Sequence, residues 1–169
     1  MKNENITGWL PSIVGKGYKD FWNCKKRFRV VKGSRGSKKS TTTALNLITR
    51  IMEYPLANLL VVRQVEKDLK QSCHAQLLWA IDRLGVSAFW KSRVSPLELE
   101  YLPTGQKIIF RGLDKWGAVT SMTVDKGYLC WCWIEECFEV SEEDFDAINE
   151  SLRAVPEPYF IQITLTFNP

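Results

Sequence analysis

The sequence lacks the features of a membrane or secreted protein. It contains no uninterrupted run of about 18 apolar residues, which a membrane helix would need. The N-terminal residues MKNENITGWL are polar and contain no signal-peptide core. Internal repeats and low-complexity segments are also missing. We therefore expect a protein of the cytoplasm that folds as one domain over residues 1–169, with residues 1–26 as a lead-in segment.

The sequence is also poor in the residues that build zinc sites and disulfide frameworks. Its single histidine, His74, is distant in the chain from Cys130, Cys132 and Cys137. The C-x-C-x₄-C spacing of these cysteines is not a usual zinc spacing, and the total of five cysteines is odd. We interpret the cysteines as small buried residues.

Acidic residues are scarce in the first quarter of the chain, although the net charge is only +4. Glu4 and Asp20 are the only acids before Thr41, whereas lysine and arginine are frequent there. Between residues 129 and 158 the balance is reversed, and Arg153 is the only basic residue. A basic face suits a polyanion such as nucleic acid. A solvated lysine-rich surface is the alternative interpretation.

Residues 28–47, FRVVKGSRGSKKSTTTALNL, contain the strongest functional motif. Phe28, Val30 and Val31 predict a strand, and residues 41–47 predict a helix. The loop between them consists mainly of small and basic residues. Backbone N–H groups in such a loop, together with the positive end of the helix dipole, favour a phosphate chain.

The loop is similar to the P-loop template G-x-x-x-x-G-K-[ST]. With Gly33 as the first glycine, Lys39 becomes the phosphate-binding lysine, Ser40 the Mg²⁺-binding hydroxyl, and Lys38 replaces the second glycine. The register with Lys38 as the phosphate lysine is less favourable, because Lys39 would then replace the hydroxyl. A basic surface loop is the alternative to a P-loop. The predicted nucleotide-binding residues are Gly33, Ser34, Arg35, Gly36, Ser37, Lys38, Lys39, Ser40 and Thr41.

The remaining pattern alternates between strands and helices. Strands are predicted at residues 27–32, 58–63, 128–134 and 159–166, and helices at residues 40–53, 65–84 and 141–153. Residues 96–101 and 107–111 predict a β-hairpin, and residues 112–123 a loop or short helix. The alternation predicts an α/β layered fold with parallel core strands, and the hairpin makes the sheet mixed.

Two acids, Glu135 and Glu136, directly follow the apolar strand at residues 128–134. Ligands of open α/β sheets lie beyond the carboxyl ends of the strands, so both acids are expected near the P-loop. Glu135 would hold Mg²⁺ beside Ser40, and Glu136 would orient or deprotonate the attacking water. A strand that runs out into solvent is the alternative interpretation.

Three further residues are candidates for a role in ATP chemistry. Arg35, within the loop, could reach the γ-phosphate and stabilise developing charge, or it could form a salt bridge that holds the loop. We predict Lys39, Arg35 and Glu136 as catalytic residues.

Thr166 and Asn168 end the last strand, where hydroxyl and amide groups beside the P-loop can sense the γ-phosphate. Asn-Pro after a strand is otherwise usually a turn.

In this order, KGSRGSKKS, LLVVRQ, the hairpin leading into FRGLDK, CWIEE and TFNP resemble the large terminase subunit of tailed bacteriophages, from about Arg27 to Pro169. The resemblance implies a P-loop NTPase fold of the RecA-like (ASCE) class, with a mostly parallel central sheet, helices on both faces and an inserted β-hairpin. It implies an Mg²⁺-dependent ATPase that drives double-stranded DNA into a preformed capsid. Arg35 then matches the arginine that many terminases carry in the P-loop, Glu135 and Glu136 match their Mg²⁺ and catalytic acids, and residues 166–169 resemble their coupling motif.

The resemblance also implies partners and a location. These are double-stranded DNA, a portal protein and a small terminase subunit in the host cytoplasm, with a ring of identical subunits when assembled and a monomer in isolation. The family's nuclease domain would follow Pro169, so we expect no nuclease activity from this chain. The alternatives are another P-loop DNA-dependent ATPase, such as a helicase or recombinase core, a small P-loop kinase, or a domain that binds nucleotide but barely hydrolyses it. The sequence leaves open whether Arg63 acts on a neighbouring subunit's ATP.

Overall fold

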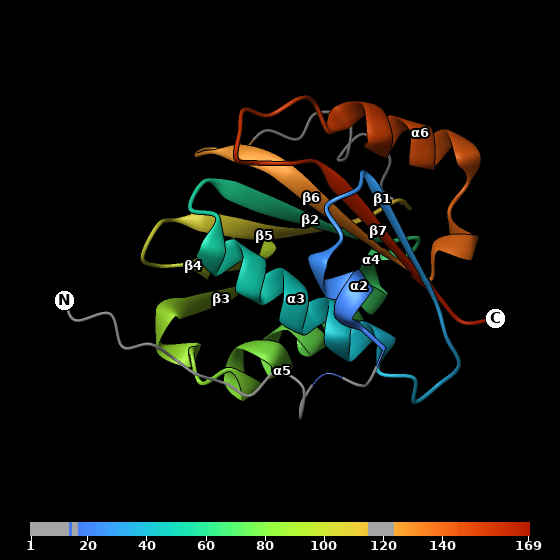
Figure 1. Cartoon of the computed structure of the whole chain (residues 1–169), viewed down its shortest axis with the longest axis horizontal. Helices are drawn as coiled ribbons and strands as arrows, with labels where there is room; N and C mark the ends of the chain where they lie inside the picture. Colours follow the sequence, from blue (N-terminus) through green and yellow to red (C-terminus); the bar gives the residue numbers. More distant parts are fainter. Residues whose placement is uncertain (1–13, 15–16, 115–123) are drawn as a thin grey trace.

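Seven strands form one sheet in the order β1-β7-β6-β2-β5-β4-β3 (Figure 1). The structure is a computed structural model that describes residues 14, 17–114 and 124–169. Its strands are β1 (Phe28–Lys32), β2 (Ala57–Arg63), β3 (Trp90–Val94), β4 (Leu97–Tyr101), β5 (Gln106–Gly112), β6 (Tyr128–Glu135) and β7 (Gln162–Phe167). Five neighbouring strands are parallel to one another, namely β1, β7, β6, β2 and β5. Strands β4 and β3 extend the sheet as antiparallel strands. The predicted mostly parallel sheet with an inserted hairpin is therefore confirmed.

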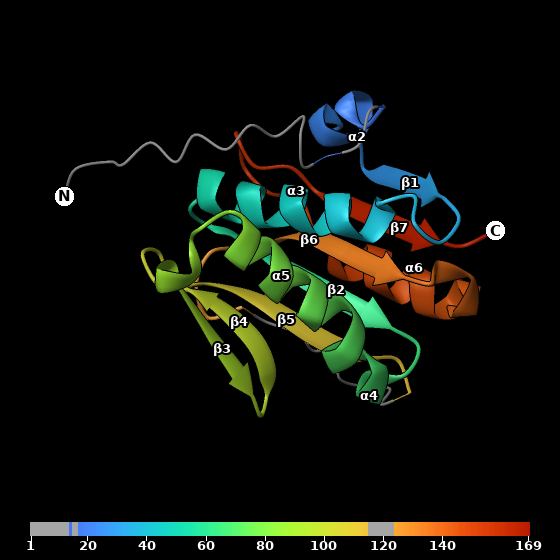
Figure 2. The ribbon, with the colours of Figure 1, turned by 90° about the horizontal axis from the view of Figure 1, so that it is seen from below.

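Helices cover both faces of the sheet, as predicted (Figure 2). One face carries α3 (Lys39–Glu53) and a second helical segment, which consists of α4 (Glu66–Leu69), a π-helical turn (Lys70–His74) and α5 (Ala75–Arg83). The opposite face carries α6 (Glu142–Ser151), and the short α2 (Lys19–Asn23) lies outside α3. None of the described helices has the length and apolar content needed to cross a membrane.

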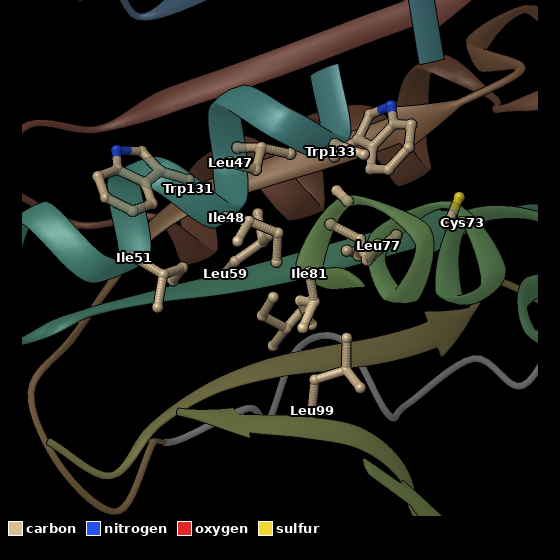
Figure 3. Close-up of a cluster of buried hydrophobic side chains, with 14 of the residues drawn as sticks. Leu47, Ile48, Ile51, Leu59, Cys73, Leu77, Ile81, Leu99, Trp131 and Trp133 are labelled. Atoms are coloured by element: carbon tan, nitrogen blue, oxygen red, sulfur yellow. The ribbon is translucent and has the colours of Figure 1, made fainter. Parts of the chain in front are cut away.

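The central strands are buried on both faces because each face packs against helices. In β2, Leu59 and Val61 belong to the hydrophobic cluster under α3 and α5, whereas Leu60 and Val62 belong to the cluster under α6. Strand β6 alternates in the same way, with Trp131 and Trp133 in the first cluster and Cys132 and Ile134 in the second. Figure 3 shows the first cluster, with the two indole rings beside α3. Two buried faces explain why the apolar runs in these strands are continuous.

The structure differs from the predicted elements at several places. Strand β3 was not predicted, because only Trp90 is buried in it and its exposed residues show no apolar alternation. The last strand begins at Gln162 rather than at residue 159, because a turn from Tyr159 N–H to the Pro156 carbonyl precedes it. The helix predicted over residues 65–84 contains the π-helical turn. Most of the lead-in segment and most of the predicted loop at residues 112–123 lie outside the described residues.

Candidate nucleotide-binding site

The predicted P-loop connects β1 to α3 at the carboxyl edge of the sheet. The N–H group of Gly33 donates a hydrogen bond to the Phe167 carbonyl of β7 at 3.3 Å, so the loop begins beside the end of the neighbouring strand. A Cβ atom at Gly33 would collide with the Ser37 hydroxyl, which explains the requirement for glycine. Gly36 has a φ of +84°, a second conformation that favours glycine.

Lys38 adopts the left-handed conformation, with φ 63° and ψ 15°, at the position where the P-loop template has its second glycine. Its side chain is exposed, and its carbonyl accepts the first bond of α3 from the Thr42 N–H at 2.8 Å. The substitution thus keeps the backbone shape of a glycine while the side chain projects to solvent. A non-glycine residue in this conformation is strained by about 1 kcal/mol.

A pocket of about 370 Å³ lies between this loop, the end of β6 and the second helical segment. Its lining includes seven of the nine predicted loop residues, namely Ser34, Gly36, Ser37, Lys38, Lys39, Ser40 and Thr41. The opposite wall consists of Glu135, Gln71, Ser72 and Gln76. The positive end of the 15-residue α3 faces this pocket together with the loop amides, so the electrostatics favour an anion.

The two predicted acids occupy different environments. Glu135 is the last residue of β6 and alternates with Trp131 and Trp133, so its side chain lies on the face covered by α3 and α5. It is 8% exposed and lines the pocket together with Ser40. Glu136 has a φ of 51°, a left-handed conformation that turns the chain out of the sheet. The structure therefore places Glu135 at the pocket, whereas Glu136 is not among the residues that line it.

Asn168 connects the P-loop to the second acid. Its Oδ1 accepts a hydrogen bond from Lys39 Nζ at 2.6 Å, and its Nδ2 donates one to Glu136 Oε1 at 2.9 Å. The other oxygen of Glu136 is buried and has no hydrogen-bond partner among the residues that the structure describes. A buried acceptor of this kind is available to a water or ligand proton.

Thr166 lies two residues before Asn168 and is fully buried. Its hydroxyl accepts a hydrogen bond from Trp133 Nε1 at 2.9 Å. Thr166 pairs with Glu135 on β6 and with Val31 on β1, so β7 lies between the P-loop strand and the strand that ends in the acids. This position beside the P-loop is the one predicted for the last strand.

The second helical segment contributes residues that sequence reasoning missed. Gln71, Ser72 and Gln76 line the pocket, and Gln76 Oε1 is buried without a partner in the described part of the chain. Cys73 is 0% exposed, and its thiol donates a hydrogen bond to Glu135 Oε2 at 3.1 Å. Burial and the nearby carboxylate raise the pKa of the Cys73 thiol, so the thiol keeps its proton and can act as the donor.

Arg63 lies beside the first acid of its own chain. Its Nε is 3.7 Å from Glu135 Oε2, and Arg63 is the last residue of β2. Arg35 is exposed, and neither Arg35 nor Gly33 contributes to the lining of the pocket. The structure thus brings Lys39, Ser40 and Glu135 together around one pocket, whereas the predicted role of Arg35 requires the side chain to move.

The lining residues fit a magnesium ion that is bound mainly through nucleotide. No group of three or more His, Cys, Asp or Glu side chains suited to a metal occurs among the residues described here. Magnesium commonly takes one or two protein ligands and completes its shell with phosphate oxygens and water. The Ser40 hydroxyl and the Glu135 carboxylate are hard oxygen ligands at the same pocket, so the set is suitable.

The end of the lead-in segment contacts the loop and α3. The Tyr18 hydroxyl donates a hydrogen bond to the Ser37 carbonyl at 2.7 Å. The buried guanidinium of Arg29 donates to the Phe21 carbonyl at 3.0 Å, and that of Arg50 to the Cys24 carbonyl at 2.7 Å. Burial lowers the pKa of both arginines. These bonds attach the end of the lead-in segment to the loop, to β1 and to α3.

Comparisons with known proteins give one consistent family. A family model described as "Phage terminase large subunit" matches residues 25–169. The chain is 43% identical over 131 residues to the terminase large subunit of Bacillus phage SPP1, which covers 76% of this chain and 31% of the relative. It is 30% identical over 141 residues to the PBSX phage terminase large subunit of Bacillus subtilis (strain 168), covering 83% of this chain and 31% of the relative.

The fold gives the same result. The large terminase of a thermophilic bacteriophage superposes with a TM-score of 0.68 at 12% identity, covering 85% of this chain and 34% of that chain. The same phage protein has also been solved in complex with ADP and with ATP-gamma-S. The chain spans about a third of the length of these terminase relatives. Because the family model covers nearly the whole described chain, this protein belongs to the phage terminase large subunit family.

Proposed function

We propose that this chain is the ATP-hydrolysing motor domain of a phage terminase and that it drives double-stranded DNA into a capsid. The observation that carries the proposal is the meeting of Lys39, Ser40 and Glu135 around one pocket, with Glu136 linked to Lys39 through Asn168. Membership of the terminase family and the nucleotide complexes of the thermophilic phage relative support it.

In this proposal each residue performs one step around the nucleotide. The loop amides and Lys39 would bind the β- and γ-phosphates, and Ser40 and Glu135 would hold the Mg²⁺ ion. When bound, Mg²⁺ neutralises charge that develops on the phosphate oxygens. Glu136 orients the attacking water and accepts its proton, and its unpaired Oε2 is suited to that task. Arg35, exposed on the loop, swings towards the γ-phosphate and stabilises the transition state.

The link to movement runs through the end of β7. Asn168 contacts both Lys39 and Glu136, so a change at the γ-phosphate alters the contacts of this residue. We propose that Thr166 and Asn168 couple hydrolysis to movement of the rest of the protein. The partners in this proposal are double-stranded DNA, a portal protein, a small terminase subunit and further copies of the chain in a ring, all in the host cytoplasm.

Nucleotide binding and turnover, measured with and without double-stranded DNA, test the proposal. We expect the wild-type chain to bind ATP in the presence of Mg²⁺ and to release inorganic phosphate slowly, and DNA to increase the rate. Lys39→Ala should abolish binding or turnover while the protein remains folded. Transfer of the γ-phosphate to a small acceptor, with no release of free phosphate, would contradict the proposal and indicate a kinase.

A further inference from the structure

The π-helical turn at Lys70–His74 controls which side of the second helical segment faces the sheet. Leu69, Cys73, Leu77 and Ile81 are all buried and lie four residues apart. In a regular helix of 3.6 residues per turn, such positions rotate around the axis by about 40° per step. A π-helical turn accommodates an extra residue and compensates this rotation. Cys73 therefore stays on the buried side, at the end of the hydrophobic cluster beyond Leu77 (Figure 3).

This orientation brings Cys73 to the carboxylate that ends β6. Its Sγ lies 3.1 Å from Glu135 Oε2, and the Nε of Arg63 lies 3.7 Å from the same oxygen. Both contacts are thus made to one oxygen of the acid. No hydrogen bond or ion pair is found for Oε1 within the described ranges, and Glu135 lines the pocket beside Ser40.

We propose that Cys73 is a positioning residue, which fixes the Glu135 carboxylate so that its free oxygen is directed to the Mg²⁺ ion of the bound nucleotide. The proposal rests on the proposed function, because it assumes that Glu135 holds Mg²⁺. Hydrogen-bond partners behind a metal ligand fix its orientation, and their removal typically lowers metal affinity or activity by about 10–100-fold. Cys73 touches neither the nucleotide nor the metal, so it acts only through Glu135.

The test measures how nucleotide binding depends on the Mg²⁺ concentration, rather than the rate of turnover. A fluorescent, slowly hydrolysed ATP analogue is bound to the wild-type chain, and the half-saturating Mg²⁺ concentration for its binding is determined. We expect Cys73→Ala to raise this concentration by about 10–100-fold. Cys73→Ser keeps a hydrogen-bond donor and should restore it to within about threefold of wild type. Cys73→Val, which fills the site without a donor, serves if the alanine variant does not fold.

A matched control and a double variant separate positioning from packing. Cys130 is also 0% exposed and belongs to the same hydrophobic cluster, but in the described part of the chain the thiol bonded to Glu135 is that of Cys73, not that of Cys130. Cys130→Ala should therefore leave the Mg²⁺ dependence unchanged. In a Glu135→Gln background, Cys73→Ala should add no further change, because the two residues act as one unit.

The possible results of this test distinguish a failure of the inference about Cys73 from a failure of the proposed function. An unchanged Mg²⁺ dependence in folded Cys73→Ala or Cys73→Val overturns the inference about Cys73 and leaves the proposed function intact. A serine variant as defective as the valine variant also overturns it, since the loss would then come from packing. If the wild-type chain binds the analogue with no Mg²⁺ dependence, the role proposed for Glu135 fails, and the inference fails with it.

Discussion

Lys39 Nζ donates a 2.6 Å hydrogen bond to Asn168 Oδ1, so the P-loop lysine is joined directly to the strand beside it. The same amide donates to Glu136 Oε1 at 2.9 Å. One side chain therefore contacts the residue proposed to bind phosphate and the residue proposed to activate water.

The first prediction concerns Asn168. In Asn168→Ala, Glu136 loses the donor that orients it, so we expect turnover to fall by about 10–100-fold with ATP affinity within about threefold of wild type. Asn168→Asp should instead weaken ATP binding, because a second carboxylate beside Glu136 repels the phosphates. Titration with a fluorescent ATP analogue and steady-state phosphate release measure the two effects. Equal losses of affinity in both variants would contradict this role.

The second prediction distinguishes the two neighbouring lysines. Lys38→Gly removes the left-handed strain, so we expect an increase of up to about 1 kcal/mol in the free energy of unfolding, with ATP binding kept. Urea denaturation measures the stability. Lys39→Ala should abolish nucleotide binding or turnover while the protein remains folded. The reverse pattern, with Lys38 essential for nucleotide and Lys39 dispensable, would show that the register is wrong.

The third prediction divides the work of the two acids. Glu136→Gln should bind ATP with Mg²⁺ about as well as wild type and hydrolyse it at least about 10²-fold more slowly, because a general base acts mainly in the transition state. Glu135→Gln should mainly weaken Mg²⁺-dependent binding. Equilibrium binding and single-turnover kinetics separate the two effects. Loss of binding in Glu136→Gln with normal turnover at saturating ATP would invert the assignment.

The fourth prediction concerns the buried bond between Trp133 and Thr166. Thr166→Val leaves the indole N–H without its partner, so we expect the free energy of unfolding to fall by about 1–3 kcal/mol. Thr166→Ser keeps the acceptor and is the matched control, with a smaller loss from the missing methyl group. Thermal and urea unfolding report the difference. Equal stability of the valine and serine variants would show that the hydrogen bond contributes little.

The fifth prediction tests Arg35. Its side chain is exposed, so Arg35→Ala should change the free energy of unfolding by less than about 0.5 kcal/mol. If Arg35 reaches the transition state, turnover should fall by about 10³-fold or more with little change in ATP affinity. Arg35→Lys is the control, since it keeps the charge without the planar group. Wild-type turnover in the alanine variant would leave Arg35 without a catalytic role.

Much of the fold could be predicted, because burial on both faces leaves a clear pattern. Strands β2 and β6 are continuous apolar runs, and the P-loop template placed α3 to within a residue. Strand β3 was missed because Lys91, Ser92 and Arg93 are exposed on an edge strand, where pairing rather than burial forms the strand. Local periodicity has no signal for such a strand.

The sequence predicted the part of the candidate site that the P-loop and the end of β6 form, but not the part that the second helical segment forms. Ser40 and Glu135 could be brought together from the sequence, because parallel strands end at one edge. Gln76 at the pocket and Cys73 behind Glu135 could not, because they belong to no motif and their positions depend on how a helix with a π-helical turn packs on the sheet. Leu69 and Cys73 alone are compatible with a regular helix, and only the repeated four-residue spacing through Leu77 and Ile81 departs from its period of 3.6 residues.

The pairing of β7 limits how far its end can move. Phe167 is in register with Lys32 on β1, and Thr166 with Glu135 on β6, so the strand is clamped on both sides almost to Asn168. Asn168 directly follows the last of these pairs, so the paired backbone of β7 holds its amide beside Lys39 and Glu136. In the proposed coupling, a displacement of Asn168 would therefore act on β1 and β6 as well as on β7 itself.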